Sequence, residues 1–194
     1  MKQLIIIPCC SAKIAGGIEI NQGLTFFENI NNVPELIERR NERINLTYPN
    51  IQEEELLPAW DRYNGRIYIR LKEHQPLINT LIAENKLDII IISALYGVIN
   101  INTPITNYNL EMGALGGVNF WNHNHILSNS INEYCLQNDI ENVYTFLRPK
   151  TYYNALIGLR EHIQMWPNGL RGVNNINNHL ADLIVQRLMQ ISEL

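Results

Sequence analysis

Two runs of isoleucine place the strongest constraint on the fold of this chain. Residues 2–8 (KQLIIIP) and 88–93 (DIIIIS) are apolar segments of strand length, rich in β-branched side chains. They lack the alternation of a half-exposed strand, and such runs are typical of strands buried on both faces of a parallel sheet. Each run ends in small, polar or glycine residues. We therefore expect two central strands whose carboxyl ends lead into loops.

Apolar residues at helical spacing surround these two runs. The pattern predicts helices over residues 33–45, 52–63, 72–85, 119–137, 151–163 and 177–193, a short strand over 65–71 and a third strand over 142–147. Alternating strands and helices favour a three-layer α/β sandwich with a mostly parallel central sheet. A length of 194 residues suits one domain spanning residues 1–194.

Composition argues against several classes of protein. The 15 Lys and Arg against 19 Asp and Glu give a net charge of -4, so the chain has no polybasic surface that would bind nucleic acid by charge alone. Its apolar runs are far shorter than the roughly 20 residues of a membrane span, and we expect a cytoplasmic protein without membrane contact. Cys9, Cys10 and Cys135 match neither a disulfide framework nor a zinc motif, so we expect reduced thiols, no metal and no cofactor. The oligomeric state stays open.

The first candidate site lies directly after the first strand. Parallel strands bring their carboxyl ends to one edge of the sheet, where open α/β sheets bind ligands. Cys10, Ser11 and Lys13 follow the first strand, and small residues with free backbone amides beside a lysine favour an anion. The alternative is an ordinary strand-to-loop turn with a solvated lysine.

A second candidate site follows the second isoleucine run. The stretch from 93 to 113 contains Ser93, Tyr96, Tyr108, Asn109 and Glu111 among several glycines. Two tyrosines and a carboxylate in such a loop can stack a flat ring and hydrogen-bond its edge. The alternative is that the glutamate is solvated or caps the loop and that the tyrosines cover the sheet.

Basic and aromatic residues mark the end of the third predicted strand. Residues 147–172 carry four basic residues against one acid, and Arg148, Lys150, Tyr152 and Arg171 lie among them. Such a mixture suits contact with phosphates or bases, and a helix start with solvated charges is the alternative. The two histidines at 123 and 125 do not share a helix face, which argues against a paired-histidine metal site.

Several motifs together resemble a known family. They are, in chain order, SAK at 11–13, LPA at 57–59, YNGRIY at 63–68, SALYGV at 93–98, YNLEMG at 108–113 and FW at 120–121. In order and spacing they are similar to the YaaA peroxide-stress protein family, over about residues 4–136, with a weaker similarity at 150–153. The stretch from 93 to 113 is the most specific part.

The resemblance implies DNA binding and a fold related to the uracil-glycosylase superfamily. A related base-modification domain, that of archaeosine synthase, has a Pro-Cys-Ser-x-x-Lys motif that looks like residues 8–13 with a shifted spacing. Residues 33–50 lack the helix-hairpin-helix pattern to which the family's DNA binding is attributed. The matched part is therefore the pocket at the sheet edge, which suits a base or nucleoside.

We therefore expect a DNA glycosylase that hydrolyses the N-glycosidic bond of a modified or damaged base, in single-stranded DNA or after base flipping. The expected catalytic residues are Glu111, as water activator or cation stabiliser, with Lys13 and Ser11. The expected base contacts are Cys10, Ser93, Tyr96, Tyr108 and Asn109. The expected DNA-backbone contacts are Arg148, Lys150, Tyr152 and Arg171.

Two other functions stay open at this point. One is a non-enzymatic DNA-binding peroxide-stress protein. The other is a hydrolase of free nucleosides or nucleotides, which the net charge of -4 suits better than DNA. For the glycosylase, defence against phage DNA with unusual bases is one setting that stays open.

Overall fold

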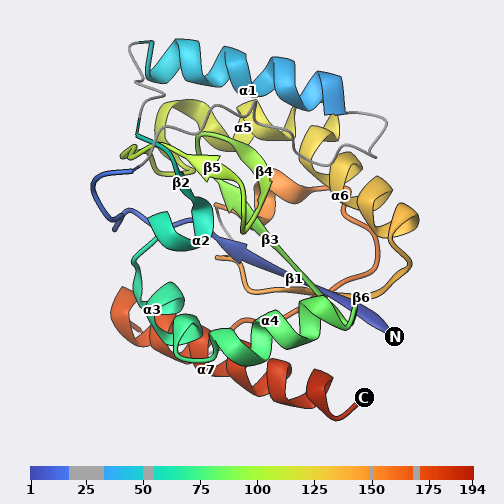
Figure 1. Ribbon diagram of the computed structural model, residues 1–194. Helices are drawn as coiled ribbons and strands as arrows, with labels where there is room; N and C mark the ends of the chain where they lie inside the picture. Colours follow the sequence, from blue (N-terminus) through green and yellow to red (C-terminus); the bar gives the residue numbers. More distant parts are fainter. Residues whose placement is uncertain (18–32, 50–54, 149–150, 168–170) are drawn as a thin grey trace.

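The computed structural model describes residues 1–17, 33–49, 55–148, 151–167 and 171–194 (Figure 1). A five-stranded sheet has the order β4-β3-β1-β6-β7. The strands are β1 (Lys2–Pro8), β3 (Leu87–Ser93), β4 (Gly97–Asn100), β6 (Ile140–Thr145) and β7 (Ile163–Gln164). All neighbours pair in parallel except β3 and β4, which form an antiparallel pair. The predicted α/β class with a mostly parallel sheet is confirmed.

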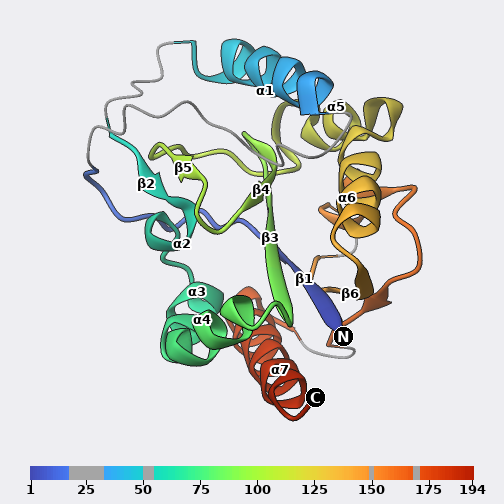
Figure 2. The same cartoon turned by 45° about the vertical axis from the view of Figure 1, so that its right-hand side comes forward.

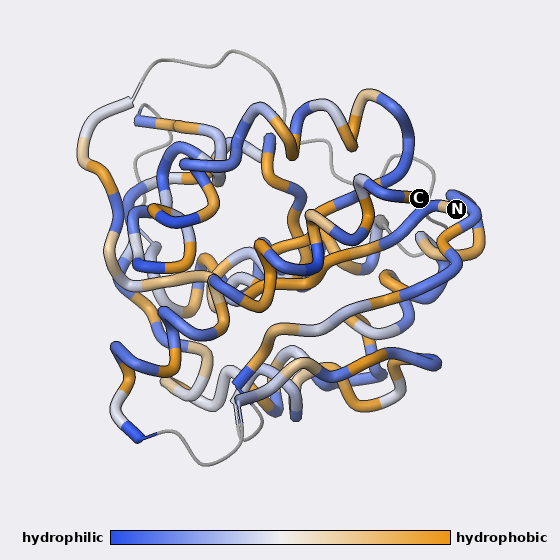
Figure 3. The backbone as a smooth tube through the Cα atoms, turned by 90° about the horizontal axis from the view of Figure 1, so that it is seen from below, coloured by the Kyte–Doolittle hydropathy of each residue, from blue (hydrophilic) through white to orange (hydrophobic). Residues whose placement is uncertain are grey.

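The isoleucine runs form the centre of this sheet. Ile5 pairs with Ile89 and Ile7 with Ile91 between the parallel strands β1 and β3. Residues 4–7 are fully buried, and the hydrophobic part of the tube in Figure 3 follows these central strands. Burial on both faces explains why neither run alternates with polar residues.

Helices cover both faces of the sheet (Figures 1 and 2). On one face lie α1 (Val33–Thr47), α5 (Gly117–Asn122) and α6 (Ile126–Gln137), and on the other α3 (Arg66–Lys72), α4 (Gln75–Ala83) and α7 (Val173–Ser192). The remaining elements are α2 (Ala59–Arg62), an antiparallel pair of β2 (Leu57–Pro58) and β5 (Pro104–Ile105), and the 3-10 turns η1 (Ala114–Gly116), η2 (His123–His125) and η3 (Tyr153–Leu156). No helix in the described ranges is long and apolar enough to cross a membrane.

Two predicted elements are wrong in type. Residues 66–72 form helix α3 rather than a strand, because Ile67, Tyr68 and Leu71 are buried on one helical face and α3 packs against α7. Residues 151–163 contain only η3 and the start of β7 instead of a helix. Their carbonyl groups accept hydrogen bonds from α6 side chains, such as that from Ser128 Oγ to the Ile157 oxygen at 2.9 Å.

Two further predicted helices are shorter than expected. The segment 119–137 breaks where Asn124 and His125 both take positive φ, so that α5 and α6 are separate helices. Residues 52–54 of the predicted helix 52–63 lie outside the described residues, and the described remainder contains β2 and the four-residue α2.

The strand order reverses at β1. The chain passes from β1 to β3 on one side and then returns across it to β6 on the other. Strands β1, β3, β6 and β7 all run in the same direction, so their carboxyl ends share one edge. In open α/β sheets, ligands bind in the crevice beyond the strand ends at such a switch point.

Candidate functional site

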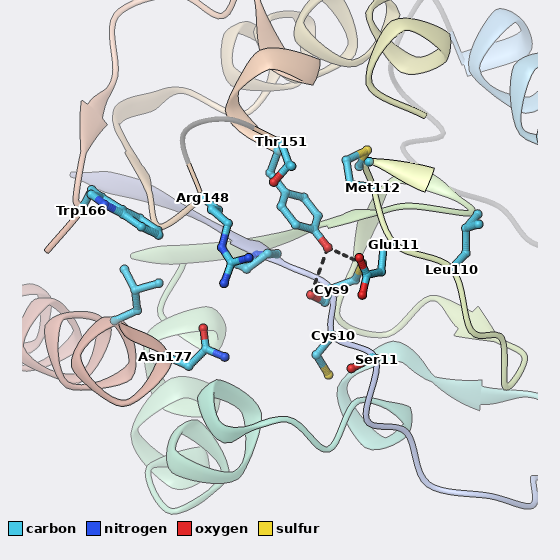
Figure 4. A pocket seen from close by; sticks show the side chains of 14 residues that line it. Cys9, Cys10, Ser11, Leu110, Glu111, Met112, Arg148, Thr151, Trp166 and Asn177 are labelled. Carbon is cyan, nitrogen blue, oxygen red and sulfur yellow. Dashed lines mark hydrogen bonds between the residues drawn. The ribbon is translucent and has the colours of Figure 1, made fainter. Parts of the chain in front are cut away.

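A pocket of about 210 Å³ opens beyond the carboxyl ends of β1, β6 and β7 (Figure 4). It is smaller than the roughly 300–1,000 Å³ of sites for drug-sized ligands, so it suits one ring or a small group better than a large cofactor. Its walls come from the turn after β1, the loop before η1, the segments after β6 and β7, and α7. The lining residues are 8–11, 110–113, Arg148, Thr151, Tyr152, Trp166, Asn177 and Leu180.

A carboxylate and a guanidinium reach this pocket from opposite sides. In Figure 4 Glu111 extends from one wall, and Arg148 extends from the other, on the same side as Asn177. Both charged residues are exposed, and neither forms an ion pair within 4.0 Å with any part of the chain that the structure describes. The site can therefore offer a negative and a positive group to the same ligand.

The turn after β1 brings two thiols to the pocket. Cys9 Sγ lies 3.2 Å from the Tyr152 hydroxyl, which also donates to the Cys9 carbonyl at 3.4 Å. Burial raises the pKa of Cys10 to about 11, and its thiol donates to the Ala12 carbonyl at 3.0 Å. Cys10 is therefore a neutral thiol at pH 7. Within the described ranges, no group of three His, Cys, Asp or Glu is placed to hold a metal ion.

Lys13 braces this turn and does not line the pocket. Its Nζ donates to the Cys10 carbonyl at 2.8 Å and lies 3.9 Å from the centre of the Tyr108 ring. Burial lowers the pKa of Lys13. The ammonium is thus used within the protein, which differs from the expected direct contact with phosphate or leaving base.

Ser93, Tyr96 and Tyr108 are buried and do not line this pocket. The Tyr108 hydroxyl lies 2.6 Å from the Tyr63 hydroxyl and 2.8 Å from Ser93 Oγ. The Tyr96 hydroxyl lies 3.1 Å from Thr106 Oγ1. Their rings and hydroxyls are occupied in the core, and contact of these three residues with a base stays a prediction.

The other predicted site residues divide into two groups. Those that line the pocket together are Cys10, Ser11, Glu111, Arg148 and Tyr152. Asn109 is exposed beside the pocket, and its backbone N–H and carbonyl both bond to the Tyr48 hydroxyl. Arg171 is exposed and does not line the pocket, and Lys150 lies outside the described residues.

Sequence reasoning missed Trp166 and Asn177 as pocket residues. Trp166 follows β7, which at two residues is too short to show a strand period. Asn177 lies in the first turns of α7 among other asparagines, so its type alone is uninformative. Trp166 lies in the basic stretch after the third predicted strand, and an aromatic residue at that place was the signal that could have identified it as a pocket residue.

The comparison with family models gives one match. A model described as peroxide stress protein YaaA matches residues 25–166. This range includes the loop of Glu111 and the pocket residues Arg148, Tyr152 and Trp166, whereas β1, Ser11 and α7 lie outside it. No curated protein matches the chain.

Proposed function

The chain belongs to the YaaA peroxide stress protein family, and on that premise we propose that its pocket holds a single modified or damaged base of DNA for hydrolysis of the N-glycosidic bond. One observation carries the proposal: a carboxylate and a guanidinium face each other across an aromatic-walled pocket at the sheet's switch point. A fold related to that of the uracil glycosylases is part of the same proposal.

Tyr152 and Trp166 are the aromatic side chains suited to stack on the base. Every base has a π face, so such stacking accepts many bases and contributes about 1–3 kcal/mol per base. The Asn177 amide has a donor and an acceptor for the edge of the base, and the Arg148 guanidinium suits a neighbouring phosphate. A pocket of about 210 Å³ suits one base better than a dinucleotide.

Glu111 is assigned to the chemistry because, among the described residues, it is the carboxylate that lines the pocket. In the proposed reaction a water oxygen bonds to C1′ of the sugar while the C1′–N bond breaks and the base departs with its electron pair. Glu111 takes the proton from the water or stabilises the positive charge that develops on the sugar. The departing base takes up a proton.

Ser11 and Lys13 have different parts in this proposal. Ser11 lines the pocket and can donate its hydroxyl hydrogen to the departing base. Lys13 acts through the backbone, since its bond to the Cys10 carbonyl holds the turn that carries Ser11. Lys13 is therefore a positioning residue rather than a catalytic one.

The substrate is a base outside the stack, in single-stranded DNA or flipped from a duplex, because an enzyme cannot reach the glycosidic bond of a stacked base. The net charge of -4 limits DNA affinity to local contacts. Those contacts are centred on Arg148, with Lys150 and Arg171 in the same basic stretch.

A base-release assay tests this function directly. The protein is incubated with DNA that carries natural, oxidised or hypermodified bases, and mass spectrometry measures the released bases beside a parallel panel of free nucleosides. Glu111→Gln should lower release from DNA by about a hundredfold or more with little change in DNA affinity, because it removes the charge but keeps the size. Glu193→Gln is the matched control, an exposed glutamate directly after α7 that does not line the pocket.

The possible results separate the three functions. Release from DNA that survives Glu111→Gln within about threefold would remove this role from Glu111. Release from nucleosides alone would favour the free-nucleoside hydrolase. DNA binding without release from any substrate would favour the non-enzymatic DNA-binding stress protein. Release limited to hypermodified bases would favour antiviral defence.

A further inference from the structure

A second cavity, of about 570 Å³, lies beside the amino end of β6, whereas the candidate site lies beyond its carboxyl end. One wall is the last turns of α6, the other is residues 159–161 before β7, and the start of β6 lies between them. Val143 of β6 is 8% exposed and Leu136 of α6 is 58% exposed, so β6 forms the floor and α6 part of the rim. A mostly apolar lining and this volume are typical of ligand sites.

Hydrogen bonds tie the wall before β7 to α6 instead of to β6. Asn132 of α6 donates from Nδ2 to the Gly158 carbonyl at 3.0 Å, and its Oδ1 accepts the Arg160 N–H at 3.0 Å. Figure 2 shows this segment, in orange, beside α6. Strand β7 is therefore short and pairs with only the last two residues of β6.

The first part of β6 has an outer edge without a neighbouring strand in the described ranges. On this outer side the Thr145 carbonyl accepts from the Met165 N–H at 2.8 Å. Main-chain groups point alternately to the two sides of a strand, so the Val143 N–H faces the same side as the Thr145 carbonyl. Pairing with β7 begins only at Tyr144, which leaves the Val143 N–H open to an added strand.

Acidic groups outnumber basic groups around this cavity. Glu141 and Glu161 line it together with one guanidinium, that of Arg160. Asp139, directly before β6, is a further exposed carboxylate, and the N-terminal ammonium of Met1 lies 3.9 Å from Glu141. The apolar lining thus suits an apolar side chain, and the rim favours a cationic one.

We propose that this cavity binds an extended segment of another protein, which adds a short strand to the outer edge of β6. An apolar side chain of that segment enters the cavity, and a neighbouring lysine or arginine lies at the acidic rim. In strand addition, main-chain hydrogen bonds provide affinity and pockets for alternate side chains provide specificity. A second copy of this chain is a poorer fit, because its own β6 edge lies at the floor of the same cavity.

A labelled peptide tests strand addition independently of the proposed hydrolysis. The probe is an acetylated peptide of alternating lysine and valine with a fluorescein label, and fluorescence polarisation follows its titration with the full chain. Two comparison peptides have the same composition in two blocks and N-methylated valines, which remove main-chain donors. We expect both to bind about tenfold more weakly or less.

Hydrogen exchange followed by NMR locates the added strand. Saturation with the alternating peptide should slow exchange of the Val143 N–H by about tenfold or more, because a peptide carbonyl then accepts from it. The Phe146 N–H is the internal control, since it already donates to the Ile6 carbonyl of β1 at 2.9 Å. Its exchange should stay within about twofold.

Two substitutions test the side-chain contacts. Leu136→Ser removes apolar surface and Glu161→Lys reverses a charge at the rim, so each should weaken binding of the alternating peptide by about fivefold or more. Ile69→Ser is the matched control for the first, because Ile69 is 48% exposed on α3 at the other face of the sheet. Glu193→Lys, after α7, is the control for the second. Both controls should stay within about twofold.

Several results would overturn the inference. They are no binding of the alternating peptide up to about 1 mM, equal affinity for either comparison peptide, and unchanged exchange at Val143. Tighter binding of a peptide of alternating glutamate and valine would refute the basic partner. Slow exchange at Val143 that increases with protein concentration in the absence of peptide would assign the edge to a second copy instead.

Discussion

Removing one hydroxyl at Tyr108 distinguishes a core tyrosine from a base-stacking one. Tyr108→Phe keeps the ring, so it preserves the contact with Lys13 Nζ at 3.9 Å and the edge contact with Tyr96 at 5.6 Å. It deletes the hydroxyl that lies 2.6 Å from the Tyr63 hydroxyl and 2.8 Å from Ser93 Oγ. The change therefore tests the hydrogen bonds alone.

The expected loss of stability follows from these two contacts. Each intramolecular hydrogen bond contributes about 0.5–1.5 kcal/mol, and a buried group left without a partner costs about 1–3 kcal/mol. Ser93 Oγ keeps the backbone N–H groups of Leu95 and Tyr96 as donors, whereas the Tyr63 hydroxyl loses its bond to Tyr108. We expect Tyr108→Phe to lower the free energy of unfolding by about 2–3 kcal/mol.

Urea unfolding followed by circular dichroism measures this loss. The melting temperature should fall by about 4–12 °C for a chain of this length. Tyr144→Phe is the control: the ring is buried against Arg187, and its hydroxyl has no hydrogen bond to the described residues, so we expect a change below about 0.5 kcal/mol. Tyr63→Phe combined with Tyr108→Phe should cost less than the sum, because both remove the same bond.

The opposite result would refute the core assignment. If Tyr108→Phe lowered the free energy of unfolding by less than about 0.5 kcal/mol and weakened base binding by about tenfold, the hydroxyl would be a ligand contact. In that case the buried arrangement with Tyr63 would not represent the binding conformation.

Three further predictions concern the pocket and the sheet. At pH 8 Cys10 should react with iodoacetamide about a hundredfold more slowly than an unperturbed thiol, because its pKa is about 11 rather than 9.0. The rate, measured by mass spectrometry, should rise with pH up to about pH 11. In a urea titration, Gly97→Ala should lower the free energy of unfolding by more than about 1 kcal/mol, since the φ of Gly97 is +73° and a Cβ there would lie 2.8 Å from the Trp121 ring. Gly16→Ala is the control: Gly16 has φ +80° but open space around it, so the loss of stability should be smaller. Arg148→Ala should reduce the slope of log affinity for DNA against log salt by about one, and an unchanged slope would show that this guanidinium contacts no phosphate.

The sequence by itself determined the centre of the sheet. A strand buried on both faces needs apolar side chains at consecutive positions, and that requirement is local to the strand. The isoleucine runs therefore predicted β1 and β3 without knowledge of their neighbours. Helical spacing likewise predicted α1, α4 and α7, with differences only at their ends.

The location of the pocket also followed from the sequence, through the direction of the strands. Parallel strands bring their carboxyl ends to one edge whatever the details of packing. For this reason Ser11, which follows β1, lines one pocket with Arg148 and Tyr152, which follow β6, although the three are up to 141 positions apart, from 11 to 152. Glu111 follows β5, which lies outside this sheet, so strand direction alone does not explain its place in the pocket.

Only the tertiary structure decided which side chains of each loop face the pocket. Tyr108 and Glu111 are three positions apart, but the tyrosine turns inward to bond to Tyr63, which lies 45 positions away. Lys13 turns to the Cys10 carbonyl and the Tyr108 ring, whereas Trp166 comes to the pocket from the far edge of the sheet. Whether a loop side chain is exposed depends on neighbours that are distant in the chain, so the residue types of the loop alone do not predict it.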